Sequence, residues 1–296
     1  MASATVQTPG SHASLPADRL EAPVPESPHH VHTTLTFVKP NEDGSPQAPI
    51  YIGRPESYER PEVNMPVTIH DVSGHELDYT LDSHGFQFHH HESKLKDFLD
   101  DKEIRQVYYP ETEQLLKDVT GATRVFIFDH TVRRAPKDFT RQGQPRGPLK
   151  RVHVDSSYHG AECKVRHHLP DEAAELLKGR YQMISVWRPI RTILRDPLAL
   201  ADAHSAPESD LFPIKFVDTS QVGEGWNVKA NPDTKWYFRY RQPPDMVTLI
   251  KFYDSKQDGR ARRTPHSSFV DPSTEHEPTR ESIEMRALLF HPEDRD

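Results

Sequence analysis

Residues 151–156 read Arg-Val-His-Val-Asp-Ser, a short run with the composition of a β-strand. In a strand, residues two apart point to the same face, so the His153 imidazole and the Asp155 carboxylate converge on one side. Two such ligands, joined by a second histidine from elsewhere in the chain, are typical of an iron(II) centre with open coordination positions. The stretch therefore predicts a metal site and a β fold that carries it.

The composition excludes several classes of protein. The net charge of -8 and the pI of about 6.2 are not the basic balance of a nucleic-acid binder. One cysteine, Cys163, excludes an intramolecular disulfide. Neither a membrane-length apolar run nor a signal-peptide pattern is visible. We expect a cytoplasmic protein that acts on a small molecule, without nucleic-acid or membrane partners; homo-oligomer formation stays open.

Short strand signals recur along the chain, and helix signals are few. Residues 1–31, rich in Ser, Ala, Pro and His without an apolar period, predict a flexible N-terminal arm, which leaves 32–296 as the folded domain. Strands are expected at 33–38, 48–52, 66–72, 124–130, 180–189, 245–253 and 282–290. The pattern favours an all-β core with flanking helices, either a sandwich or a closed jelly roll.

Local signals predict two hairpins, two helices and one long loop. The hairpins join 33–38 to 48–52 and 226–229 to 235–241. The first helix begins over 93–99, with Ser93 as a possible N-cap, and continues over 100–120, broken at Pro110 and capped by Gly121; the second covers 171–178. The polar loop 131–148 leads into the His153 strand and is interpreted either as a lid over the site or as a plain disordered connection.

The second histidine of the metal site is expected far along the chain. His266 is the best candidate, because it follows the apolar strand that ends at Tyr253. Arg280 and Arg286 come after it, and the planar fork of an arginine binds a carboxylate through two hydrogen bonds. Arg286 lies in an apolar strand, so it needs an anionic partner: Glu284, another acidic side chain, 2-oxoglutarate or a substrate.

Several segments together resemble the fungal AsaB-type hydroxylase/desaturase family, which includes a gibberellin desaturase and is often compared with a cephem 7α-methoxylase component. The segments are 185–189, 195–200, 223–228, 264–269 and 280–286, and the resemblance covers about 33–292. It implies a double-stranded β-helix that uses iron(II), 2-oxoglutarate and dioxygen in specialised metabolism. It also implies that His153, Asp155 and His266 bind the metal. Arg280 matches the position expected to bind 2-oxoglutarate, and Arg286 is the alternative.

Two other classes of function stay open from the residues themselves. One is a non-oxidative metalloenzyme, such as a zinc hydrolase or a cupin-type isomerase, and the other is a non-catalytic subunit of a partner enzyme. Five residues are candidates for a substrate pocket, although Trp187 also fits core packing and Arg188 also fits a strand end: Tyr158, Trp187, Arg188, Asn227 and Lys251. The sequence does not distinguish hydroxylation from desaturation or cyclisation, because substrate placement decides between them.

Overall fold

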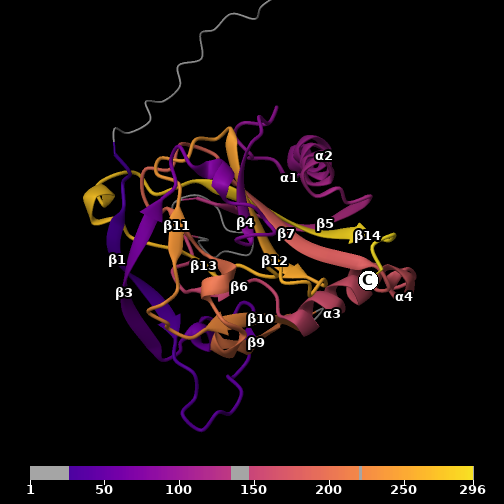
Figure 1. Ribbon diagram of the computed structural model, residues 1–296, viewed down its shortest axis with the longest axis horizontal. Helices are drawn as coiled ribbons and strands as arrows, with labels where there is room; N and C mark the ends of the chain where they lie inside the picture. Colours follow the sequence, from indigo (N-terminus) through magenta and orange to yellow (C-terminus); the bar gives the residue numbers. More distant parts are fainter. Residues whose placement is uncertain (1–26, 135–146, 220–221, 296) are drawn as a thin grey trace, which may run out of the picture.

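A computed structural model describes residues 27–134, 147–219 and 222–295, which form two β-sheets with a few helices outside them (Figure 1). The nine-stranded sheet has the order β1 (Val31–Val38), β3 (Glu62–Asp71), β11 (Trp236–Phe238), β8 (Leu198–Ala201), β13 (His266–Ser268), β6 (His153–Val154), β10 (Val222–Val228), β9 (Leu211–Val217) and β2 (Ile50–Tyr51). The five-stranded sheet has the order β4 (Phe86–His90), β12 (Met246–Asp254), β7 (Arg180–Pro189), β14 (Ser282–His291) and β5 (Arg124–Arg133).

The five-stranded sheet is buried on both faces, as its nearly continuous apolar strands require. Ile184 and Val186 of β7 pack with Leu116 of α2 (Tyr109–Thr120) on the outer face. Trp187 points the other way and packs with Leu200 of the nine-stranded sheet. The two sheets therefore share an apolar interior, and the interleaved strand order is that of a double-stranded β-helix. The predicted all-β jelly roll with flanking helices is confirmed.

The helix predicted from Ser93 begins only at Asp101, where Asp100 is the N-cap, and it does not break at Pro110. α1 (Asp101–Glu103) runs into a π-helix (Ile104–Tyr108) and then directly into α2. Pro110 directly follows the π-helical turn, in which the Tyr109 amide donates to the Ile104 carbonyl oxygen, so the irregular turn lies where proline has no amide hydrogen to donate. α2 ends at the predicted cap, since Gly121 has a φ of 71°, which glycine adopts without strain.

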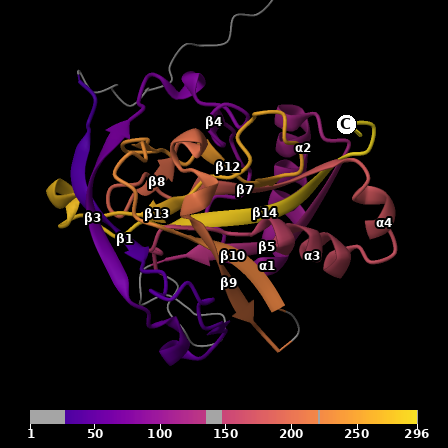
Figure 2. The ribbon, with the colours of Figure 1, turned by 60° about the horizontal axis from the view of Figure 1, so that its bottom comes forward.

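A second pair of helices covers the end of the sheets, with α3 (Tyr158–His168) packed on β10 and α4 (Ala173–Leu176) beyond it (Figure 2). α4 lies within the predicted helix 171–178, but α3 was not predicted. The missed signal is Ser157, whose Oγ accepts a hydrogen bond from the Gly160 amide at 2.9 Å and so caps the helix.

Both predicted hairpins are wrong. β1 pairs with β3 along eight positions, while β2 pairs with β9. β10 pairs with β6 and β9, and β11 pairs with β3 and β8. In both cases the turn between the segments is present, but a more distant strand offers a longer or more deeply buried ladder, which outweighs proximity along the chain.

The end of the predicted N-terminal arm is attached to the domain. Residues 1–26 lie outside the described residues, but the His29 ring stacks on Tyr240 at 4.0 Å, and its Nε2 lies 2.8 Å from Asp271 Oδ2. These contacts lead the chain into β1. Within the described ranges, no helix is long and apolar enough to cross a membrane.

Candidate metal centre

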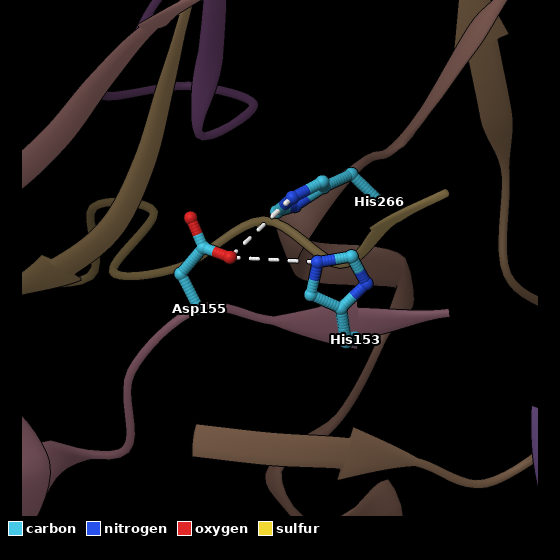
Figure 3. Close-up of side chains that lie close together, drawn as sticks. All are labelled: His153, Asp155 and His266. Carbon is cyan, nitrogen blue, oxygen red and sulfur yellow. Dashed lines mark ion pairs between the residues drawn. The ribbon is translucent and has the colours of Figure 1, made fainter. Parts of the chain in front are cut away.

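The three predicted metal ligands lie on neighbouring parts of the nine-stranded sheet. β13 pairs with β6 so that His266 stands directly opposite His153. Asp155 follows β6 at a bend, and its carboxylate turns back toward both rings (Figure 3). Asp155 Oδ1 lies 3.4 Å from His153 Nε2 and 4.0 Å from His266 Nε2. One ligand atom from each residue lies within 4.8 Å of the others. A single metal ion fits among them.

Backbone carbonyl groups orient both imidazoles. His153 Nδ1 lies 2.8 Å from the Arg151 carbonyl oxygen, and His266 Nδ1 lies 3.1 Å from the Thr264 carbonyl oxygen. A carbonyl only accepts, so each Nδ1 donates and each neutral ring keeps a lone pair on Nε2. Both lone pairs then face a carboxylate oxygen, an arrangement that a cation between them stabilises.

The charge state of the ligands also suits a cation. Burial and the neighbouring His153 lower the pKa of His266 to about 4, which keeps its ring neutral at pH 7. Burial opposes ionisation of Asp155, but the neighbouring His153, His266 and Arg286 outweigh it and hold the carboxyl pKa below its ordinary value. Asp155 Oδ2 is buried and has no partner among the described residues. Two neutral imidazoles and one carboxylate are the donor set of a facial iron(II) site.

Arg280 is a buried cation without a carboxylate partner in the described part of the chain. Its Nη1 donates to the Asp196 carbonyl oxygen at 2.9 Å, its guanidinium lies 5.3 Å from the Trp187 ring centroid, and its Nε has no partner. Burial, followed by the nearby charge of Arg133, lowers the pKa of Arg280 to about 9. Such a group gains most from an anionic ligand.

Arg286 differs from Arg280 in its partners. Its Nη2 donates to Asp129 Oδ2 at 2.7 Å and to Thr131 Oγ1 at 3.1 Å. Burial opposes its charge, but Glu284 and then Asp155 outweigh the burial and raise the pKa of Arg286. The expected need for an anionic partner is therefore met by Asp129 within the protein.

A cavity of about 490 Å³ opens beside the metal ligands. One wall comes from the ligand segment and β14, another from β9 and β10, and a third from β5 and α3. Its lining includes His153, Asp155, Arg286, Phe216, Gly223, Phe128, Asp129, Lys164, Met183 and Phe252. The mixture of aromatic and charged side chains suits a small molecule with a few polar groups.

Several of these cavity residues were missed by the sequence analysis. Phe128 and Asp129 stand in a strand that was recognised only as buried. Lys164 belongs to α3, which was not predicted at all. Phe216 and Gly223 flank residues 220–221, and only the pairing of β9 with β10 and β6 brings them to the site. Residues 135–146 of the predicted lid lie outside the described residues.

None of the five predicted pocket residues lines this cavity. Trp187 packs in the interior beneath Arg280. Tyr158 contacts Trp226 and hydrogen-bonds Glu208. Arg188 points to the opposite face of the sheet and donates to Tyr108 Oη at 3.0 Å and to the carbonyl oxygens of His91 and Pro244. Lys251 is wholly buried in an ion cluster.

Asn227, the fifth predicted pocket residue, lies beside the metal ligands. It stands opposite His153 in the pairing of β10 with β6. Its side chain does not border the 490 Å³ cavity.

The chain is similar to known proteins over most of its length. A family model described as an oxidoreductase/YMDC permease-like domain matches residues 35–290. The hydroxylase/desaturase efuI of Hormonema carpetanum is 36% identical, over 88% of this chain and 95% of its own length. The hydroxylase/desaturase asaB of Aspergillus flavus is 32% identical, over 84% of this chain and 90% of its own length. A solved structure of the iron and alpha-ketoglutarate-dependent endoperoxidase NvfI superposes with a TM-score of 0.77 at 25% identity, over 88% of this chain and 98% of that one.

Proposed function

The chain belongs to the fungal AsaB-type hydroxylase/desaturases, a family of iron(II)/2-oxoglutarate-dependent oxygenases, and from this premise we propose which of its residues carry the reaction. It is a non-haem dioxygenase that uses iron(II), 2-oxoglutarate and dioxygen. It hydroxylates, desaturates or oxidatively cyclises a small-molecule intermediate of specialised metabolite biosynthesis. We also propose that the enzyme acts in the cytoplasm and has no nucleic-acid or membrane partner. Its catalytic domain covers residues 32–296.

His153, Asp155 and His266 hold the iron. The single observation that carries this assignment is the pair of Nε2 lone pairs facing the Asp155 carboxylate, with both Nδ1 atoms occupied by carbonyl groups. Iron(II) bound there with 2-oxoglutarate activates dioxygen and so supplies the oxidising power for an unactivated C–H bond. The backbone contacts of the two imidazoles keep each ring in the neutral, metal-binding tautomer without rearrangement.

Arg280 binds the distal carboxylate of 2-oxoglutarate. Its guanidinium is buried and lacks an anionic partner in the described residues, whereas Arg286 already pairs with Asp129. A dicarboxylate supplies the missing charge and two acceptor oxygens for the planar fork. Arg286 lies close enough to Asp155 to lower its pKa, and it therefore helps to keep the Asp155 carboxylate ionised. Arg286 also lines the cavity.

The test is an anaerobic titration of the apoprotein with iron(II) and then with 2-oxoglutarate, followed by visible absorption. The expected result is a weak metal-to-ligand charge-transfer band that requires both additions and disappears in His266→Ala. The matched control is His276→Ala, whose side chain is 77% exposed and should leave the band unchanged. A full band in His266→Ala would contradict the ligand assignment.

A further inference from the structure

Asn227 is placed next to the metal ligands by strand pairing. β10 lies on the side of β6 away from β13, so His266, His153 and Asn227 occupy one row across three adjacent strands. Side chains directly opposite one another on antiparallel strands project to the same face. The Asn227 amide therefore stands on the face that carries the metal site.

The Asn227 amide is buried and lacks a hydrogen-bond acceptor. The residue is only 6% exposed, and its Nδ2 has no partner among the residues that the structure describes. A buried donor without a partner destabilises the folded protein, and most such groups in native proteins are satisfied. An acceptor supplied by a bound ligand accounts for this one.

The strand that carries Asn227 is held tightly against the ligand segment. A Cβ atom on Gly225 would lie 3.0 Å from the Val154 carbonyl oxygen and 3.3 Å from that of Asp155. Glycine at this position lets β10 approach the chain that bears both ligands. Asn227, two residues further along the same face and paired with β9 as well, has a rigid position.

Two ligands with acceptor oxygens come to this site, and the location of Asn227 distinguishes them. The cavity offers the room that a substrate needs, and Gly223 of β10 lines it but Asn227 does not. Asn227 is instead buried opposite His153, so an acceptor that reaches its amide would come from a ligand bound beside His153. Arg280, which hydrogen-bonds the carbonyl of Asp196 just before β8, lies on the other side of the row of ligands.

We propose that Asn227 is a positioning residue whose Nδ2 donates a hydrogen bond to the metal-binding end of 2-oxoglutarate, through an oxygen of its C1 carboxylate. The co-substrate is then held at its two ends, by Asn227 beside the metal and by Arg280 at the distal carboxylate. This inference rests on the proposed function. The hydrogen bond adds a second contact, besides the metal, at that end of the co-substrate and so favours one orientation of its C1 carboxylate.

The experiment compares Asn227→Leu, which keeps the shape and removes the amide, with the wild-type protein. The probe is 2-oxoglutarate, added anaerobically to the iron-loaded protein, and the readouts are its Kd, the position of the charge-transfer band and the melting temperature of the apoprotein. We expect the Kd to rise about tenfold, as for a hydrogen bond to a charged group, and the band to shift. The melting temperature should stay constant or rise, because no internal hydrogen bond is lost.

The matched control is Gln242→Met, a buried amide whose Nε2 donates to the Met246 carbonyl oxygen at 2.8 Å and to Thr248 Oγ1 at 3.0 Å. It should lower the melting temperature and leave the Kd of 2-oxoglutarate unchanged. An unchanged Kd and band in Asn227→Leu would overturn the inference, as would a melting temperature lowered as far as in the control. If the wild-type protein itself gave no band, the proposed function would fail instead.

Discussion

Two buried charged clusters in this molecule differ in how completely their polar atoms are paired. At the far end of β12, Lys251 Nζ donates to Asp82 Oδ1 at 2.7 Å, to Asp254 Oδ2 at 2.9 Å and to the Ala261 carbonyl oxygen at 3.0 Å. All three of its hydrogens are used. At the metal centre, buried atoms of four residues lack partners within the described ranges: Asp155 Oδ2, Asn227 Nδ2, Arg280 Nε and Arg286 Nε. The first cluster is complete without a ligand, and the second is not.

The number of internal partners distinguishes structural from functional charged residues better than their exposed fraction does. Lys251 and Arg280 are both almost wholly buried cations, with 0% and 5% of their surface exposed. Among the described residues, Lys251 has two carboxylate partners, whereas Arg280 has one carbonyl group. Native proteins satisfy nearly all buried polar groups, so a local concentration of unsatisfied ones indicates a ligand that is part of the working molecule.

The strongest test of the comparison is Asp155→Ala. Removing the only carboxylate ligand should abolish turnover, because two imidazoles alone do not hold iron(II) with the required charge and geometry. The apoprotein should remain folded, because Asp155 Oδ2 has no partner among the described residues and Oδ1 loses only its contacts with the His153 and His266 rings. Succinate formation from 2-oxoglutarate and thermal unfolding measure the two effects. Full activity in this variant would remove the metal assignment.

The complementary test is Lys251→Met, in the paired cluster. Asp254 is wholly buried beside it, and removing one partner of a buried ion pair typically costs about 3–5 kcal/mol. Urea denaturation should show this loss in the free energy of unfolding. The charge-transfer band per folded molecule should stay the same. A variant that kept its stability but lost the band would reverse the roles that we assign to the two clusters.

A smaller effect is expected for Arg280→Leu, which removes a cation with one internal hydrogen bond. The KM for 2-oxoglutarate should rise about 100-fold, equivalent to about 3 kcal/mol for a charge-assisted pair, with little change in stability. Arg286→Leu is the matched variant, and it should instead be destabilised because Asp129 loses its partner. Steady-state kinetics at varied 2-oxoglutarate distinguishes them. The opposite ranking of KM values would assign the co-substrate to Arg286.

The smallest effect concerns His168, which stacks on the cavity residue Phe128 at 5.3 Å. Burial, then Lys164 and His167, lower its pKa to about 4 from an ordinary 6.5. The unfolded chain therefore takes up the proton first as the pH falls, so stability decreases between about pH 6.5 and pH 4. His168→Phe should flatten this part of the stability curve, as measured by urea unfolding at several pH values. An unchanged slope would show that His168 is not a source of the pH dependence.

The sequence predicted the fold class and the approach of the three ligands because both depend on local patterns that survive in one dimension. The period of two places His153 and Asp155 on one face, and ordered motifs carry the family resemblance as far as Arg286. A local sequence pattern does not show whether a buried charged side chain finds hydrogen-bond partners within the protein. Lys251 and Arg188 are pocket candidates by sequence, but the structure gives each several internal hydrogen bonds instead.

Other failures come from pairing between segments that are distant in sequence. The wall formed by β9 and β10 reaches the site only because β10 adds to the edge of β6, which a hairpin signal at Asn231 concealed. The helix α3 depends on the Ser157 cap and on glycine at 160, where a Cβ would lie 2.3 Å from the Glu224 carbonyl oxygen. Both requirements come from neighbours that the sequence alone does not identify.

The brevity of the two ligand strands has a consequence for the life of the protein in the cell. β6 has two residues and β13 has three, and the histidines that they bear are more than a hundred residues apart in the chain. A shared ion ties these segments together as a reversible cross-link, and a ligand at 1,000 times its Kd adds about 4 kcal/mol of stability. Iron supply should therefore govern how long each molecule survives proteolysis, as well as whether it is active.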